Sequence, residues 1–272
     1  MESEHYQLDP ERLKNEVQAI WEQNADFWDE AMGEGNQFQR VLIQPAVERL
    51  LALQPGEVVL DVACGNGLFA RRMAQLGAFV VACDFSQTLL DRARERSSEY
   101  AARIEYELID ATSREQLLSL GKQRFDAVYC GMAIQDMPEI TPLFSAAAEL
   151  IKPRGRFIFS IPHPAFNNSY IRKCIEEEDR QGEMIVQRSI RITGYILPRT
   201  DRGIGIIGQP VSQYYFHRPI SLIYNTAFKN GFILDGIEEP VFRPEDEGSR
   251  PFSWANYQGI PPVLVSRLRR SQ

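Results

Sequence analysis

The chain has 272 residues, a formal net charge of −7 (30 basic against 37 acidic residues) and 44% hydrophobic residues. This length fits one α/β domain with an insertion, and the acidic balance excludes a general basic surface for nucleic acid. No apolar stretch is long enough to span a bilayer, and the start, Met1-Glu2-Ser3-Glu4, is acidic where a signal peptide would be basic. We therefore expect a cytoplasmic protein without a membrane or nucleic-acid partner.

The four cysteines indicate neither a metal site nor a disulfide framework. Cys64, Cys83, Cys130 and Cys174 show no metal-ligand spacing. We interpret them as reduced thiols that serve as small apolar side chains, and we expect no metal.

The N-terminal part, residues 1–53, is predicted to be helical. Apolar residues between Pro10 and Glu30 recur at spacings of three and four, as in an amphipathic helix. After a glycine-rich break, a second helix is expected over Phe38 to Leu53, interrupted near Pro45.

The next segment, Val58 to Gly67, reads VVLDVACGNG and predicts a buried strand, a glycine-rich turn and then a helix. Such a turn lies at the carboxyl end of a parallel strand, where open α/β sheets bind ligands. The glycines Gly65 and Gly67 let a ligand approach the backbone, but they also fit the dinucleotide fingerprint. Asp61, just before the turn, would repel a pyrophosphate and would attract a cationic ligand such as S-adenosylmethionine.

Two further predicted strands also end in aspartate. Phe79 to Cys83 is followed by Asp84, and Ile104 to Ile109 is followed by Asp110. Asp84 comes roughly 20 residues after the glycine turn, where α/β nucleotide folds place a carboxylate on ribose hydroxyls. We expect Asp110 and the next residue, Ala111, beside an adenine bound across the same edge of the sheet.

The segment from Val59 to Gly67 resembles the first motif of the class I S-adenosylmethionine-dependent methyltransferases, and Asp84 and Asp110 stand in that family's second- and third-strand positions. Phe125 to Pro138 resembles the fourth strand and the loop under the methyl donor, and Glu149 to Ser160 resembles the following helix, turn and fifth strand. The resemblance covers about residues 40 to 161 and resumes near residue 217, with normal loop lengths.

The resemblance implies a Rossmann-like, doubly wound, seven-stranded and mostly parallel sheet with an antiparallel last strand. It implies S-adenosylmethionine as cofactor, S-adenosylhomocysteine as product, and the following cofactor-binding residues: Asp61, Ala63, Cys64, Gly65, Asn66, Gly67, Asp84, Phe85, Asp110, Ala111, Cys130, Gly131 and Met132. Ala63 stands where many members have glycine, in a variant that also resembles enzymes that methylate quinone precursors. The loop lacks the Asn-Pro-Pro-Tyr type tetrad, which counts against amide or exocyclic base nitrogens.

Residues 162–216 are predicted to be an insertion, because about 55 residues far exceed a normal loop. Met184 to Ile192 alternates apolar and polar residues like a half-exposed strand. We expect one antiparallel arm that leaves the carboxyl end of a central strand and hangs over the cofactor site. The arm would be a lid that selects substrates or a dimerisation arm, and the protein would be a monomer or a homodimer.

The C-terminal part completes the expected single domain, 1–272, whose core comprises 54–161 and 217–268. Ile220 to Asn230 predicts a helix, and Phe232 to Ile237 and Pro261 to Ser266 predict the last strands, which resemble the family's antiparallel pair. The basic end, Arg267 to Arg270, is interpreted as a solvated tail.

Methyl transfer from a sulfonium needs mainly alignment and exclusion of water, and a base only when the nucleophile arrives protonated. The catalytic candidates are His163, which is expected at the pocket mouth, His217 and Asp136, which could orient a hydroxyl or amine. Alternatively, His163 fastens the arm and Asp136 caps a helix. The substrate-binding candidates are Trp28, Gln135, Asp136, His163, Tyr214 and Tyr215, and three further aromatic residues are candidates to line the pocket: Tyr6, Phe27 and Phe38.

The predicted function is transfer of a methyl group from S-adenosylmethionine to an oxygen or nitrogen, or a carbon, of a small, partly hydrophobic metabolite. One alternative is a non-catalytic relative that binds an adenosyl ligand or a protein partner. The other is an NAD-dependent oxidoreductase. A thermal-stability measurement distinguishes the two enzyme functions: S-adenosylmethionine should protect a methyltransferase against heat, and NAD should protect an oxidoreductase.

Overall fold

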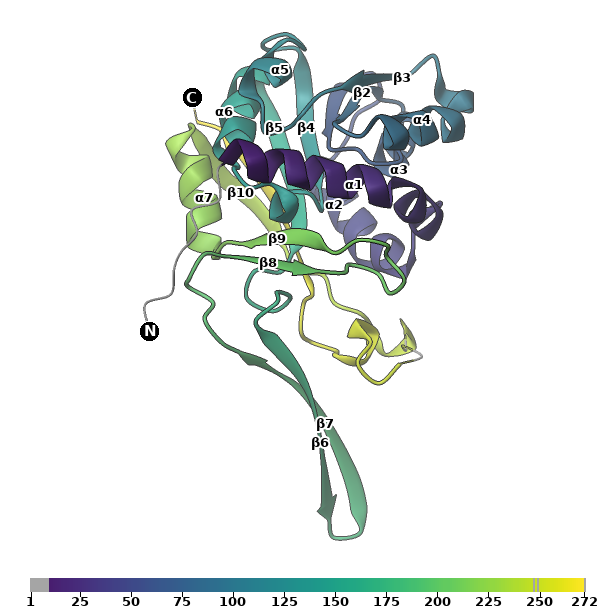
Figure 1. Ribbon diagram of the computed structural model, residues 1–272, viewed down its shortest axis with the longest axis vertical. Coiled ribbons are helices and arrows are strands. Elements are labelled where there is room, and N and C mark those ends of the chain that lie inside the picture. Colours follow the sequence, from purple (N-terminus) through teal and green to yellow (C-terminus); the bar gives the residue numbers. More distant parts are fainter. Residues whose placement is uncertain (1–9, 247, 249, 272) are drawn as a thin grey trace.

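The computed structural model describes residues 10–246, 248 and 250–271, and its centre is a seven-stranded sheet (Figure 1). The strand order is β10-β11-β5-β4-β1-β2-β3. The strands are β1 (Val58–Val62), β2 (Phe79–Asp84), β3 (Ile104–Leu108), β4 (Phe125–Gly131), β5 (Ile151–Pro162), β10 (Phe232–Glu238) and β11 (Val263–Arg270). The last strand, β11, runs antiparallel to both of its neighbours, and β1 to β5 are parallel. The predicted sheet is therefore confirmed.

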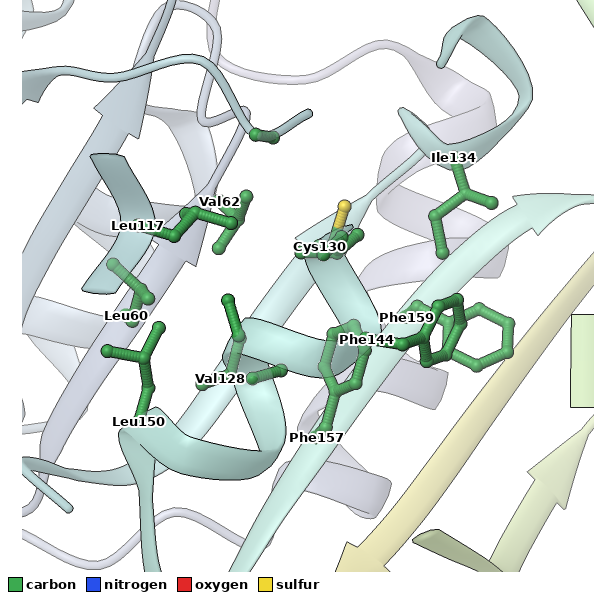
Figure 2. Close-up of a cluster of buried hydrophobic side chains, with 14 of the residues drawn as sticks. Leu60, Val62, Leu117, Val128, Cys130, Ile134, Phe144, Leu150, Phe157 and Phe159 are labelled. Atoms are coloured by element: carbon green, nitrogen blue, oxygen red, sulfur yellow. The ribbon is translucent and has the colours of Figure 1, made fainter. Parts of the chain in front are cut away.

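Helices cover both faces of this sheet. They are α2 (Gln44–Leu51), α3 (Leu68–Gln75), α4 (Gln87–Arg96), α5 (Arg114–Leu118), α6 (Thr141–Leu150) and α7 (Ile220–Lys229). Because side chains alternate along a buried strand, Leu60 and Val62 of β1 belong to the cluster of Figure 2 together with residues of α5, α6 and α7. Val59 belongs to a second cluster on the opposite face, with residues of α2 and α3. Short helical turns lie at η2 (Ser98–Tyr100), η3 (Ile134–Asp136), η4 (Pro244–Asp246) and η5 (Trp254–Asn256).

The N-terminal helix α1 (Pro10–Met32) crosses the carboxyl ends of the parallel strands (Figure 1). The expected interruption near Pro45 is a π-helical turn, η1 (Gln39–Ile43), directly before α2. Proline has no N–H to donate, so the regular hydrogen-bond pattern is lost at this point. Among the described residues, no helix is both long and apolar enough to cross a membrane.

The insertion forms two antiparallel hairpins, where the sequence predicted one arm. The outer hairpin consists of β6 (Ile171–Arg180) and β7 (Glu183–Ile192), and it extends away from the sheet (Figure 1). The inner hairpin, β8 (Arg199–Gly203) and β9 (Gln213–His217), lies beside α1. The prediction that the arm hangs over the cofactor site is therefore wrong for β6 and β7, because the chain after β5 first turns outward and returns to the sheet edge only at β8.

The basic end of the chain is not a solvated tail. Arg267 to Arg270 belongs to β11, and Arg267 and Arg269 both pair with Asp235 on the neighbouring strand β10. Leu268, between them, is fully buried. The alternation of arginine and leucine is thus that of a strand with one buried face.

Candidate functional site

A cavity lies where the ends of the parallel strands meet α1. Its wall includes these predicted cofactor residues: Asp61, Ala63, Cys64, Gly65, Asn66, Asp84, Phe85, Asp110, Ala111, Gly131 and Met132. The predicted substrate residues Trp28 and Asp136 also line it. We call the part at the ends of β1, β2 and β3 the donor end, and the part at the loop after β4 the acceptor end.

At the donor end, Asp84 and the glycine turn hold each other in place. One oxygen of Asp84 accepts the backbone N–H of Gly65 at 2.9 Å, and the other accepts that of Ser86 at 2.9 Å. Burial raises the pKa of Asp84 to about 6. A carboxylate oxygen can accept more than one hydrogen bond, so Asp84 retains acceptor capacity for ligand hydroxyls.

Asp61 and Gly65 provide the test of whether this end fits S-adenosylmethionine. The Oδ2 atom of Asp61 is buried without a hydrogen-bond partner among the described residues. Burial, followed by the nearby Asp84 carboxylate, raises the pKa of Asp61 to about 8. A ligand ammonium would supply both the missing donor and the missing positive charge. A Cβ atom on Gly65, whose φ is +55°, would project into open space, so the turn leaves room for such a ligand.

Asp110 is tied to α1. Its Oδ1 atom accepts the backbone N–H and the hydroxyl of Thr112, both at 2.7 Å. Its Oδ2 atom accepts Gln18 Nε2 at 2.9 Å and pairs with Lys14 Nζ at 2.8 Å. The helix thus closes over the third strand end, and Lys14 and Gln18 become part of the cavity wall.

The sequence prediction did not include the polar face of α1, although the four-residue spacing of its polar residues is visible in the sequence. Lys14, Gln18, Glu22 and Asp26 follow one another at intervals of four residues, which places them on one face of a helix. Glu22 accepts Ser86 Oγ at 2.5 Å, and Asp26 pairs with Arg92 at 3.0 Å. Further along, Asp29 accepts Asn66 Nδ2 at 3.0 Å and pairs with Arg96 at 2.5 Å. This polar face fixes α1 over the strand ends.

At the acceptor end, Asp136 is buried and both of its oxygens accept amide hydrogen bonds. Gln135 Nε2 donates to Oδ2 at 2.9 Å, and Gln213 Nε2, from β9, donates to Oδ1 at 3.1 Å. Burial raises the pKa of Asp136 well above its usual value. The Arg218 guanidinium holds the same loop by donating to the carbonyls of Met137 at 2.7 Å and Pro138 at 2.8 Å. Neither Gln213 nor Arg218 carried a local signal in the sequence.

The structure brings neither candidate histidine to the cavity. His163 Nδ1 accepts the backbone N–H groups of Ala165 and Phe166 at 3.2 and 3.3 Å, so its proton is on Nε2, which donates to Glu239 at 2.8 Å. Burial lowers the pKa of His163. His217 Nε2 donates to the carbonyl of Tyr195 at 2.7 Å. The predicted position of His163 at the pocket mouth is therefore wrong, because its ring fastens the start of the insertion.

Several other candidates lie outside the cavity wall. Tyr214 donates its hydroxyl to Glu16 of α1 at 2.7 Å. Burial, followed by the nearby Asp136 carboxyl group, raises the pKa of Tyr215. The rest of this group is Gln135, Gly67, Cys130, Phe27 and Phe38. A Cβ atom on Gly67 would collide with the Tyr106 hydroxyl, and Cys130 belongs to the apolar cluster of Figure 2. Tyr6 lies outside the described residues.

The described residues contain no group of three or more His, Cys, Asp or Glu side chains that could hold a metal ion. The sheet order defines a Rossmann-like α/β protein, and the aspartates at the ends of β1 and β2 lie at the edge of the sheet where such proteins bind ligands.

A family model described as a methyltransferase domain matches residues 59–155. The ubiquinone biosynthesis O-methyltransferase of Coxiella burnetii is 31% identical over 151 residues, which cover 54% of this chain and 61% of that relative. The match therefore spans less than two thirds of the relative's length. The structure of an S-adenosylmethionine-dependent methyltransferase from Mesorhizobium loti is similar with a TM-score of 0.66 and 26% identity, covering 83% of this chain and 96% of that one. The family match, the relative and the similar structure together support a class I S-adenosylmethionine-dependent methyltransferase.

A further similar structure is the 1,6-didemethyltoxoflavin-N1-methyltransferase of Burkholderia thailandensis with bound 1,6-didemethyltoxoflavin and S-adenosylhomocysteine. Its TM-score is 0.61 at 16% identity, covering 97% of this chain and 92% of that one. At this identity the likeness shows the fold alone.

Proposed function

We propose that this protein transfers a methyl group from S-adenosylmethionine to an oxygen or nitrogen of a small, partly hydrophobic metabolite, with carbon as the remaining option. The observation that carries the proposal is one continuous cavity whose wall includes the carboxylates of the donor end and Asp136 of the acceptor end. A donor and an acceptor held in one cavity can be aligned for in-line displacement.

The donor end suits the cofactor. S-adenosylmethionine, when bound, supplies a methyl group that is already activated by its positive sulfur. In this proposal, the free Oδ2 atom of Asp61 accepts from the α-ammonium, and Asp84 accepts from the ribose hydroxyls. Asp110 and Ala111 border the adenine.

The acceptor end suits a partly apolar molecule with a polar atom. Aromatic and thioether side chains form much of the cavity wall: Trp21, Trp28, Phe69, Tyr129, Met32, Met132 and Met137. Within the described part of the chain, the indole N–H of Trp28 has no hydrogen-bond partner. We infer that Trp28 donates to the acceptor and that Asp136, held by its two glutamine partners, orients the acceptor's hydroxyl or amine.

Water must be excluded for the displacement to be efficient. Helix α1 closes the strand ends, and the inner hairpin covers α1: the Asn24 side chain bonds the backbone N–H and C=O of Val211 at 3.0 and 2.8 Å. We therefore propose the inner hairpin, and not the outer one, as the substrate-selecting part of the insertion.

The similarity to a ubiquinone biosynthesis O-methyltransferase supports an oxygen nucleophile, and the acidic net charge of −7 supports a small molecule over nucleic acid. We also retain the cytoplasm as the proposed location. Binding to RNA that weakens steeply with salt would contradict the exclusion of nucleic acid.

The experiment that tests the proposal incubates the protein with metabolite extract and S-adenosylmethionine that carries a deuterated methyl group. A metabolite that gains the labelled methyl, identified by mass, supports the proposal and reveals the acceptor atom. In parallel, S-adenosylhomocysteine should raise the melting temperature and NAD should not. Binding of the adenosyl ligand without any labelled product would favour the non-catalytic alternative, and protection by NAD alone would favour the oxidoreductase.

A further inference from the structure

The outer hairpin, residues 171–192, has no part in the proposed methyl transfer and extends away from the body of the molecule (Figure 1). Each of its strands has 10 residues, and the two strands form a sheet of their own. An isolated two-stranded hairpin is marginally stable at best in water, and it normally needs further strands or a packed element. A hairpin of this length is thus a candidate for a surface that a partner covers.

One face of the outer hairpin is rich in apolar residues. The cross-strand pairs on this face are Ile171–Ile192, Lys173–Ile190, Ile175–Arg188, Glu177–Val186 and Asp179–Met184. Met184, Val186 and Ile192 are 61%, 43% and 40% exposed. Exposed apolar residues gathered on one sheet face, next to two unpaired strand edges, are typical of an interaction surface.

The base of the hairpin is fixed to the body. The Lys173 ammonium lies 3.7 Å from the ring centroid of Trp254 and 5.1 Å from that of Tyr257, and it donates to the carbonyl of Phe252 at 2.8 Å. The Tyr257 hydroxyl donates to the carbonyl of Cys174 at 3.4 Å. These contacts set the direction of the hairpin and leave its outer half uncovered within the described chain.

Charge divides the hairpin into two halves. On the apolar face the base carries Arg188, besides Lys173, whose ammonium the body holds, and the tip carries Glu177 and Asp179. The opposite face repeats this division, with Arg172 and Arg191 at the base and Glu176, Glu178 and Glu183, together with Arg180, at the tip. When two such hairpins lie antiparallel, each acidic tip meets the basic base of the other hairpin, and a twofold axis repeats the contact. Parallel hairpins would place like charges opposite each other, which is destabilising.

We propose that the outer hairpin associates with the same hairpin of a second copy of this chain, in an antiparallel, twofold-symmetric homodimer that covers the apolar face. The self-complementary charges favour a second copy over an unrelated partner, because one surface supplies both halves of the match.

The test measures the mass of the full chain by sedimentation velocity over a wide range of concentrations. The wild type should be a dimer, and Val186→Glu should be a monomer because it buries a charge in the apolar face. A tip-reversed variant, E177R with D179R, makes the tip of the apolar face basic, and a base-reversed variant, R188E, replaces the cation Arg188 of the same face by an acid. Each should be monomeric because like charges then meet across the contact. Mixed together, these two variants should form a heterodimer, since each tip again meets a base of opposite charge.

The matched control is Ile233→Glu, which places a charge on an exposed apolar residue of edge strand β10, 51% exposed, and should leave the dimer intact. Unchanged protection by S-adenosylhomocysteine in every variant shows that the body is folded. A monomeric wild type, dimers in the hairpin variants, or a mixture that stays monomeric would overturn the proposal.

Discussion

The two ends of the cavity differ in how the chain builds them. The donor end consists of strand ends and the turns that follow them. The bond from Gly65 to Asp84 spans 19 residues, and the long-range bonds at this end, such as that from Gln18 to Asp110 over 92 residues, come from the covering helix α1. The acceptor end depends on Asp136 and Gln213, which are 77 residues apart. A change at the donor end should therefore act on cofactor binding, and a change at the acceptor end on turnover with the cofactor still bound.

The largest effect is expected at the glycine turn. Gly65→Val places a branched side chain in the open space where the proposal puts the cofactor, and titration calorimetry should detect no binding of S-adenosylhomocysteine. Gly56→Val is the matched control, because Gly56 also has a positive φ, +87°, and open space but lies outside the cavity wall. Normal binding by the Gly65 variant would mean that the turn only shapes the fold.

A smaller loss is expected for the ribose contact. Asp84→Ala removes a charged acceptor, which typically contributes about 1.5 to 3 kcal/mol, so the Kd for S-adenosylhomocysteine should rise about 10- to 100-fold. Asp91→Ala removes an exposed carboxylate of α4 and should leave the Kd unchanged. An unaltered Kd in Asp84→Ala would remove this residue from the site.

At the acceptor end, Gln213→Leu keeps the volume of the side chain but removes the donor to Asp136. We expect turnover of the acceptor found by methyl labelling to fall about 10- to 100-fold through misalignment, with the Kd for S-adenosylhomocysteine unchanged. Gln187→Leu on the outer hairpin is the control. A parallel loss of cofactor binding would show that the two ends are not separable.

The donor end should also respond to pH. The ligand ammonium favours the ionised form of Asp61, whose pKa in the free protein is about 8, so binding releases a proton. Affinity for S-adenosylhomocysteine should therefore increase, by up to about tenfold per pH unit, as the pH rises toward 8, and level off above it. Asp61→Asn should bind weakly and without this slope. A flat profile in the wild type would separate Asp61 from the ammonium.

The smallest effect is expected where the outer hairpin is removed. The Thr193 hydroxyl donates to the carbonyl of Tyr170 at 2.9 Å, so the hairpin's flanking residues lie side by side and a short Gly/Ser linker can replace residues 171–192. Cofactor affinity and turnover should not change. Lost turnover would instead assign the outer hairpin to the acceptor site.

One property of the sequence made both the sheet and the donor end predictable. Buried parallel strands appear as continuous apolar runs, and each run ended in a residue that the fold must place at one edge. The roles of Asp61, Asp84 and Asp110 stay predictions, as does the division of one domain into residues 1–53, 54–161 with 217–268, and 162–216. The position of the three aspartates in one cavity wall, however, follows from the local sequence pattern alone.

The histidines show where this reasoning stopped. His163 has a position in the chain, directly after a central strand, that suits catalysis, but its ring bonds two backbone N–H groups and Glu239, 76 residues away. A side chain's neighbourhood in sequence does not reveal which distant groups satisfy it. The same holds for the unpredicted Gln213 and Arg218.

The sequence by itself determined the local features: the apolar runs that form strands, the glycine turn, the three strand-end aspartates and the alternation of apolar and polar residues in the outer hairpin. The tertiary structure alone decided that α1 closes the cavity through Lys14 and Gln18, that the insertion divides into two hairpins, and that only the inner one approaches Asp136. The physical reason is the distance along the chain over which each interaction acts. Strand and turn preferences act over a few residues, whereas burial of a polar side chain is satisfied by whichever partner the folded chain brings within hydrogen-bond distance.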